Sequence, residues 1–155
     1  MTTAQHLAVI ERLRVRAFPA ERGPSEVGTS GPGYHLAELP GADGLGDGGF
    51  RDDGGFRDDG AYSAADADQS AAEHTALTEI LTARFGEPRY ISLWSALIRG
   101  GEGEEIPEPW RELSSGVRWL RLWRTGDRWL AVGLAGGTGD QRFRLVAAVT
   151  ETDPP

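Results

Sequence analysis

Apolar residues near the start of the chain are spaced as in an amphipathic helix. Leu7, Ile10 and Leu13 are three residues apart, and a threonine at position 2 or 3 can cap the helix. Pro19 ends the pattern. From position 13 the residues also alternate as in a strand, but the spacing before that point favours a helix. We therefore predict an amphipathic helix within residues 1–20.

A second helical pattern begins at Ser70. Ser70 and Glu73 have the spacing of a capping box, in which the serine hydroxyl accepts the N–H three residues later. Gly86 stands where a helix commonly ends, and Pro88 prevents its continuation. The apolar stripe of this predicted helix consists of Leu77, Ile80, Leu81 and Phe85. A shorter helix is predicted over residues 92–99.

After Trp110 the apolar period changes from that of a helix to that of a strand. We predict three strands, over residues 117–124, 128–135 and 143–149. Gly126 and Asp127 suit a two-residue hairpin turn, and this turn sets the register of the first two strands. The pairs that follow from it are Trp123–Leu130, Arg121–Val132, Trp119–Leu134, Arg124–Trp129, Leu122–Ala131 and Leu120–Gly133.

Residues 21–69 differ in composition from all of these segments. Glycine, proline, aspartate and serine dominate, and apolar residues are too sparse to offset the entropy of ordering the chain. We therefore predict a long disordered Gly/Asp-rich arm, which acts as a flexible linker before a small domain at residues 70–155. The predicted fold class is α+β, with one or two helices packed on a three-stranded antiparallel meander.

The predicted linker contains the hexapeptide Gly-Gly-Phe-Arg-Asp-Asp twice in succession. A calcium loop that starts at Asp47 would need oxygen ligands at its third and fifth positions, which are Gly49 and Arg51. The glycines of residues 44–49 formally match a dinucleotide-binding fingerprint, but the required strand and helix do not flank them. We interpret the repeat as a duplicated linker tract that holds neither a metal nor a cofactor.

The composition excludes several classes of site. The chain has 155 residues, a net charge of −8 and no cysteine, so disulfides, thiolate catalysis and zinc–thiolate sites are excluded. All 16 basic residues are arginine, and a Walker A loop needs a lysine. The acidity opposes general binding to nucleic acid or to an anionic membrane. No apolar run has the length of a membrane span, so we expect a cytoplasmic protein.

Two sets of residues are candidates for catalysis. His6, His35 and His74 lie in separate parts of the chain, and no pair has the spacing of metal ligands. Four carboxylates cluster in a loop rich in glycine and proline, namely Glu102, Glu104, Glu105 and Glu108. Such a cluster usually means a solvated acidic loop, although paired carboxylates can perform acid–base chemistry. An enzyme that uses this loop is therefore an alternative to a binding protein.

The predicted C-terminal sheet mixes tryptophan with arginine. Residues 111–155 hold seven arginines and five acidic residues, whereas the rest of the chain is strongly acidic. Tryptophan and arginine are enriched as anchors at protein interfaces, so we predict a face that binds a partner protein. Nucleic-acid bases also stack on such sheets, which makes a nucleic-acid-binding sheet the first alternative, ahead of the enzyme. The candidate contact residues are Trp110, Trp119, Arg121, Trp123, Arg124 and Trp129.

The C-terminal part of the chain contains the stretches TALTEILTARFGEP, EIPEPW and LWRTGDRWLAVGL and the ending TDPP. With these stretches, roughly the last 80 residues resemble a group of small uncharacterised proteins of GC-rich actinobacteria. It implies an α+β fold with a terminal meander and no particular activity. Together with the composition, these observations favour a non-enzymatic protein-binding or regulatory module that uses no cofactor.

Overall fold

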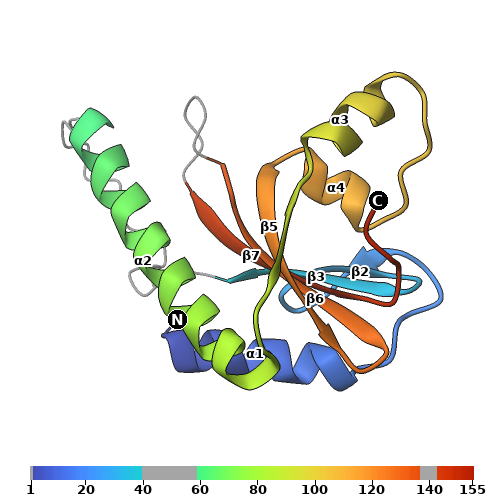
Figure 1. The fold of residues 1–155 in the computed structure, drawn as a ribbon, viewed down its shortest axis with the longest axis horizontal. Helices are drawn as coiled ribbons and strands as arrows, with labels where there is room; N and C mark the ends of the chain where they lie inside the picture. The colour runs from blue at the N-terminus through green and yellow to red at the C-terminus, as the bar shows by residue number, and fades with distance from the viewer. Residues whose placement is uncertain (1, 40–58, 137–142) are drawn as a thin grey trace.

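The computed structural model describes residues 2–39, 59–136 and 143–155, with the backbone alone for residues 59–67. One seven-stranded antiparallel sheet forms the middle layer, in the order β1-β2-β3-β7-β6-β5-β4. Helices α1 and α2 lie on one side of it, and α3 and α4 lie on the other (Figure 1). The helices are α1 (Thr3–Val15), α2 (Asp59–Phe85), α3 (Trp94–Gly101) and α4 (Trp110–Ser114). The strands are β1 (Gly23–Pro24), β2 (Gly28–Gly31), β3 (Tyr34–Leu39), β4 (Arg89–Ser92), β5 (Val117–Thr125), β6 (Arg128–Ala135) and β7 (Arg144–Thr150).

The prediction of a three-stranded meander behind a long disordered arm is wrong. Strands β5, β6 and β7 form the predicted meander, but β4 extends it at one side and β3, β2 and β1 extend it at the other. The three additional N-terminal strands lie within residues 23–39, which composition assigned to the linker. All six residues of β3 pair with β7, so this segment is held by backbone hydrogen bonds that its composition does not reveal.

The glycines of this N-terminal segment serve the sheet. Gly28 of β2 lies opposite Ala37 of β3. A Cβ atom added at Gly28 would collide with the backbone carbonyl oxygen of Leu36. β2 and β3 therefore approach each other closely at this position, which only glycine allows. Composition alone counts Gly28 as a sign of a linker, whereas the sheet requires it for packing.

Helix α1 lies within the range 1–20 that the apolar spacing predicts. Thr2 caps it, because its hydroxyl accepts from the N–H of Gln5, and the Gln5 side chain accepts from the Thr2 N–H at 2.7 Å. Its buried face consists of His6, Val9, Ile10 and Leu13.

Helix α2 ends as predicted but begins earlier. Gly86 follows it with a φ of 94°, and its N–H donates to the Thr82 carbonyl at 2.9 Å, which confirms the predicted glycine terminator. However, the helix starts at Asp59, so Ser70 is an interior residue and not a cap. Its hydroxyl donates to the Phe143 carbonyl oxygen at 3.5 Å instead. The alanine-rich segment before Ser70 has the propensity to continue the helix towards the N-terminus.

The sheet buries apolar side chains on both faces. Towards α1 and α2, the cluster includes Trp123, Leu130 and Val149. Towards α3 and α4, a second cluster includes Leu122, Ala131 and Ala148. Because both faces are covered, β6 and β7 are apolar along almost their whole length.

The predicted hairpin register between β5 and β6 is confirmed for five of its pairs, from Leu120–Gly133 to Arg124–Trp129. The sixth, Trp119–Leu134, is wrong, because the register shifts between Val117 and Leu120. This bulge adds a residue to β5 and bends the strand where Trp119 lies. Among the described helices, none is long and apolar enough to cross a membrane.

Candidate interaction surface

The structure does not bring the six predicted contact residues to one face. Trp110 and Trp123 are fully buried, in the clusters on opposite faces of the sheet, and Trp129 is almost fully buried. Trp119 is exposed, Arg121 is partly exposed and Arg124 is exposed. The three buried tryptophans pack the core, and their side chains are not available to a partner.

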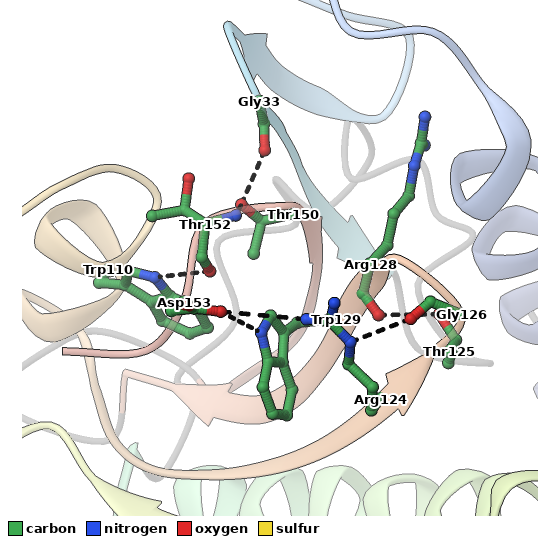
Figure 2. A network of polar contacts seen from close by, with 10 residues as sticks. All are labelled: Gly33, Trp110, Arg124, Thr125, Gly126, Arg128, Trp129, Thr150, Thr152 and Asp153. Atoms are coloured by element: carbon green, nitrogen blue, oxygen red, sulfur yellow. Dashed lines mark hydrogen bonds and ion pairs between the residues drawn. The ribbon is translucent and has the colours of Figure 1, made fainter.

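Two of the buried tryptophans anchor the C-terminal segment. The indole N–H of Trp110 donates to the Thr152 carbonyl oxygen at 3.3 Å, and that of Trp129 donates to an Asp153 carboxylate oxygen at 3.1 Å (Figure 2). The hydroxyl of Thr150 donates to the Gly33 carbonyl oxygen at 2.7 Å, which connects the same segment to the β2–β3 turn. The indoles of Trp110 and Trp129 therefore hold the C-terminal segment against the layer that contains α4.

Arg124 belongs to this network as well. Its guanidinium lies over the Trp129 ring at 5.1 Å and lies 3.9 Å from the same Asp153 carboxylate. Its Nε donates to the Gly126 carbonyl oxygen at 2.9 Å, across the hairpin turn (Figure 2). Arg124 therefore makes intramolecular contacts at the β5–β6 turn, far along β5 from Trp119.

Arg121 lies in the middle of β5 and Trp119 lies nearer its start, and both are beside the outermost strand β4. Arg121 pairs with Tyr90 of β4, and Trp119 pairs with Ser92. The side chains of Tyr90 and Trp119 are each 59% exposed. Such exposure is unusual for two large aromatic side chains on neighbouring strands and makes this region the candidate interaction surface.

Helix α3 adds apolar side chains to the same region. Leu93, immediately before the helix, and Ala96 within it are buried against the sheet. Trp94 is 54% exposed, and Leu97 and Ile98 are 42% and 43% exposed. These three residues have the i, i+3, i+4 spacing of one helical face, so α3 presents a large apolar stripe to solvent.

We name this region the β4–α3 surface. Its members are Tyr90, Trp94, Leu97, Ile98, Arg118, Trp119 and Arg121. A groove of about 530 Å³ crosses it, between α2 and α3. Trp94, Leu97 and Trp119 line the groove together with the buried side chains of Leu93 and Val117. The groove is thus mainly apolar, as binding grooves commonly are.

The charges on the β4–α3 surface are arginines stacked on aromatic rings. The guanidinium of Arg121 lies 4.8 Å from the Tyr90 ring centroid, and that of Arg118 lies 5.9 Å from the Trp94 ring. Within the described ranges, neither arginine forms an ion pair. Both therefore retain N–H donors for an acceptor outside the chain.

His74 of α2 lies at the margin of the groove. Its burial lowers the pKa of the imidazole below the ordinary value of 6.5, and the nearby positive charge of Arg121 lowers it further. A neutral His74 offers one donor and one acceptor to an occupant of the groove.

The other histidines are buried in separate places. His6 lies in α1, and His35 lies in β3 with its Nδ1 atom 2.7 Å from the Ser30 hydroxyl oxygen. The three histidines are thus on three different elements, as their positions in the sequence suggested. The described residues hold no group of three or more His, Cys, Asp and Glu side chains that could bind a metal ion.

The acidic loop connects α3 to α4. Glu102, Glu104 and Glu105 are exposed, and Glu104 forms an ion pair with Arg99 at 3.3 Å. Glu108 is partly buried and accepts from the backbone N–H of Glu112 at 3.3 Å. The contacts of Glu104 and Glu108 are thus local and belong to α3 and α4. The doubled hexapeptide, except for its final residue in α2, lies outside the described residues.

Sequence reasoning missed Tyr90, Trp94, Leu97 and Ile98. The strand β4 was not predicted, because four residues after a helix give too little alternation to recognise. The apolar stripe of α3 was visible, but such a stripe is normally the buried face of a helix. The available signal was the number of apolar residues in this short helix. One small contact with the sheet cannot bury all of them, so some must be exposed.

Comparisons of the chain with protein-family models, with curated proteins and with solved structures gave no match. The functional argument therefore rests on the geometry of the chain itself.

Proposed function

We propose that this chain is a protein-binding module that acts by association and not by catalysis, with the β4–α3 surface as its contact face. The observation that carries the proposal is the exposure of five large apolar side chains on adjoining elements, namely Tyr90, Trp94, Leu97, Ile98 and Trp119. Val15 is the sole other large apolar side chain of comparable exposure in the described part of the chain. Clustering of this kind supports a contact surface, whereas scattered exposed apolar residues are ordinary.

The composition of the surface supports a protein partner in particular. Aromatic residues and arginine are the side chains that most often dominate the binding energy of protein interfaces. Leu97 and Ile98 are aliphatic and offer no ring on which a base can stack. The net charge of −8 also repels a polyanion as a whole. These features favour a protein partner over nucleic acid.

The test is affinity capture with matched surface variants. The tagged full-length chain, a Trp94→Ser/Trp119→Ser variant and a Val15→Ser variant are each incubated with nuclease-treated lysate of the organism that encodes the protein. Val15 is 81% exposed on α1 and serves as the control, because it removes an apolar surface residue elsewhere. Bound proteins are identified and quantified by mass spectrometry.

We expect one protein to be captured in stoichiometric amount by the wild type and by Val15→Ser, and to be lost from the double variant. Equal capture by all three chains would place the contact elsewhere and reject the β4–α3 surface. Capture of nucleic acid alone from lysate that has not been treated with nuclease would reject a protein partner.

A further inference from the structure

In the part of the chain that the structure describes, the outer edge of β4 is open. β4 is the last strand of the described sheet and pairs there on one side only, with β5. The N–H of Leu93 donates to the Arg118 carbonyl at 2.9 Å, in register with the strand pairing. Because hydrogen-bonded and non-hydrogen-bonded pairs alternate in an antiparallel ladder, Tyr90 and Ser92 direct their backbone N–H and C=O groups away from β5.

The open edge can therefore pair with one more strand. Tyr90 and Ser92 each contribute a backbone donor and a backbone acceptor on that side. In the described part of the chain, neither residue makes a backbone hydrogen bond outside the strand pairing. Proteins commonly protect such an edge, and an unprotected one is a template for an incoming strand.

Arginine side chains flank the edge. Arg121 stacks on Tyr90 on the face of the sheet covered by α2, and Arg89 lies 5.6 Å from the Trp129 ring on the opposite face. Arg118 stacks on Trp94 at the start of α3. None of these three arginines forms an ion pair within the residues that the structure describes. The edge therefore attracts negative charge, although the chain as a whole is acidic.

We propose that β4 accepts an extended, acidic segment of the partner protein as an eighth strand of the sheet, with an apolar side chain of that segment seated in the groove beside Trp94 and Trp119. This inference rests on the proposed function and specifies the chemistry of the partner. Backbone hydrogen bonds to Tyr90 and Ser92 supply affinity that does not depend on the amino-acid sequence of the incoming segment. Carboxylates opposite the arginines and the apolar anchor supply specificity.

A second copy of this chain is a poorer occupant of the edge. Antiparallel pairing of β4 with β4 would bring the arginines of both copies to one edge, where like charges destabilise the pair. An acidic segment has the opposite charge and removes the conflict. Charge complementarity therefore favours an acidic segment of a partner over a second copy of this chain.

The test uses synthetic peptides and the full-length chain. A displayed library of random twelve-residue peptides is selected against the wild type, and enriched peptides are labelled for binding measurements by fluorescence anisotropy. Each is also synthesised with single backbone N-methyl groups along its length. N-methylation removes a donor, so in a strand addition it weakens binding at alternate positions only.

We expect the enriched peptides to be acidic and to contain a large apolar residue, and binding to weaken with a period of two along the N-methyl series. Arg121→Gln should weaken binding about tenfold, since charge-assisted hydrogen bonds are among the stronger polar contacts. The matched control is Arg12→Gln, because Arg12 is an exposed arginine on α1. Both variants are checked for an unchanged thermal midpoint.

The outcomes separate this inference from the proposed function. Peptides that lose binding on Trp94→Ser but tolerate Arg121→Gln and every N-methyl group would overturn the strand addition and leave the binding surface in place. Failure to enrich any peptide, with no partner captured from lysate, would overturn both. A dimer of the free chain that dissociates when a selected peptide binds would identify the second copy as the occupant of the edge and overturn the acidic partner.

Discussion

The indole N–H of Trp123, near the end of β5, donates to the carbonyl oxygen of Gly86 at 2.9 Å. Gly86 is the residue that follows α2, with a φ of 94°. The bond therefore joins the end of the longest helix to the sheet that it covers. It also explains why Trp123 is buried, because the ring packs among the side chains of α1 and α2 while its one polar atom is paired.

Replacement of Trp123 by phenylalanine should destabilise the fold. The change removes the donor to Gly86 and leaves a small cavity, so we expect a loss of about 1–3 kcal/mol in the free energy of unfolding. Chemical denaturation followed by circular dichroism measures it. The matched control, Trp94→Phe, alters an exposed ring and should change the free energy by less than about 0.5 kcal/mol. Equal effects would contradict the packing described.

Two glycines near the N-terminal strands should respond differently to alanine. At Gly28 an added Cβ would collide with the Leu36 carbonyl oxygen, so β2 and β3 must move apart. We expect Gly28→Ala to cost about 1–3 kcal/mol, as overpacking does. At Gly23 the added Cβ meets nothing within 4 Å. Gly23→Ala should therefore be neutral in a thermal denaturation series, and a neutral Gly28→Ala would contradict the pairing of β2 with β3.

The stability of the C-terminal segment should depend on a hydrogen-bond acceptor at position 153. Asp153→Ala removes the partner of the Trp129 indole N–H, and we expect a loss of about 1 kcal/mol, because Asp153 is itself exposed and water can replace part of the contact. Asp153→Asn retains an oxygen acceptor and should recover most of that loss. Hydrogen exchange of the Trp129 indole, followed by NMR, provides the measurement. If the Trp129 indole were protected in Asp153→Ala as well as in the wild type, the Asp153 carboxylate would not be its acceptor.

The buried histidine His35 should make stability depend on pH. Burial lowers the pKa of His35 below its ordinary value of 6.5, and the positive charges of Arg128 and Arg16 lower it further, against the raising effect of backbone hydrogen bonds at Arg16 and Ala17. Below pH 6.5 the unfolded chain binds a proton that the folded chain does not. This stabilisation is therefore complete above pH 6.5 and is lost as the pH falls towards the lowered pKa.

Urea denaturation at a series of pH values between 7.5 and about 5 tests this expectation. The variant His35→Gln cannot take up the proton, so its unfolding free energy should depend less on pH over that range. His74 has a lowered pKa as well and contributes in the same direction, so His74→Gln serves as the comparison. If the unfolding free energy of the His35→Gln/His74→Gln double variant depended on pH as in the wild type, the assignment of the pH dependence to these two histidines would be wrong.

The tryptophans should divide into two classes when each is replaced by serine. Trp110 is fully buried in the cluster with α3 and α4, so Trp110→Ser should cost about 3–5 kcal/mol or prevent folding. Trp119 is 59% exposed, and Trp119→Ser should change stability by less than about 0.5 kcal/mol. Thermal denaturation of the purified variants distinguishes the two. A large loss for Trp119→Ser would make it a core residue and remove it from the proposed surface.

Features that depend on neighbouring residues alone follow from the sequence. The two-residue turn at Gly126 and Asp127 set the register of β5 and β6, and the glycine at position 86 set the end of α2. Both follow from local backbone geometry. The helical spacing of the first apolar residues likewise corresponds to α1.

Contacts between distant parts of the chain, which local patterns do not specify, set which segments join the sheet and which apolar faces are covered. Strands β1, β2 and β3 are held by pairing with β7, a contact between distant parts of the chain that the composition of residues 21–39 does not reveal. In the same way, Trp110 and Trp119 are equally apolar in the sequence, but Trp110 is fully buried in the cluster on the α3 and α4 side of the sheet, whereas Trp119 is 59% exposed. Periodicity shows that a face is apolar, whereas its burial depends on what the rest of the chain places against it.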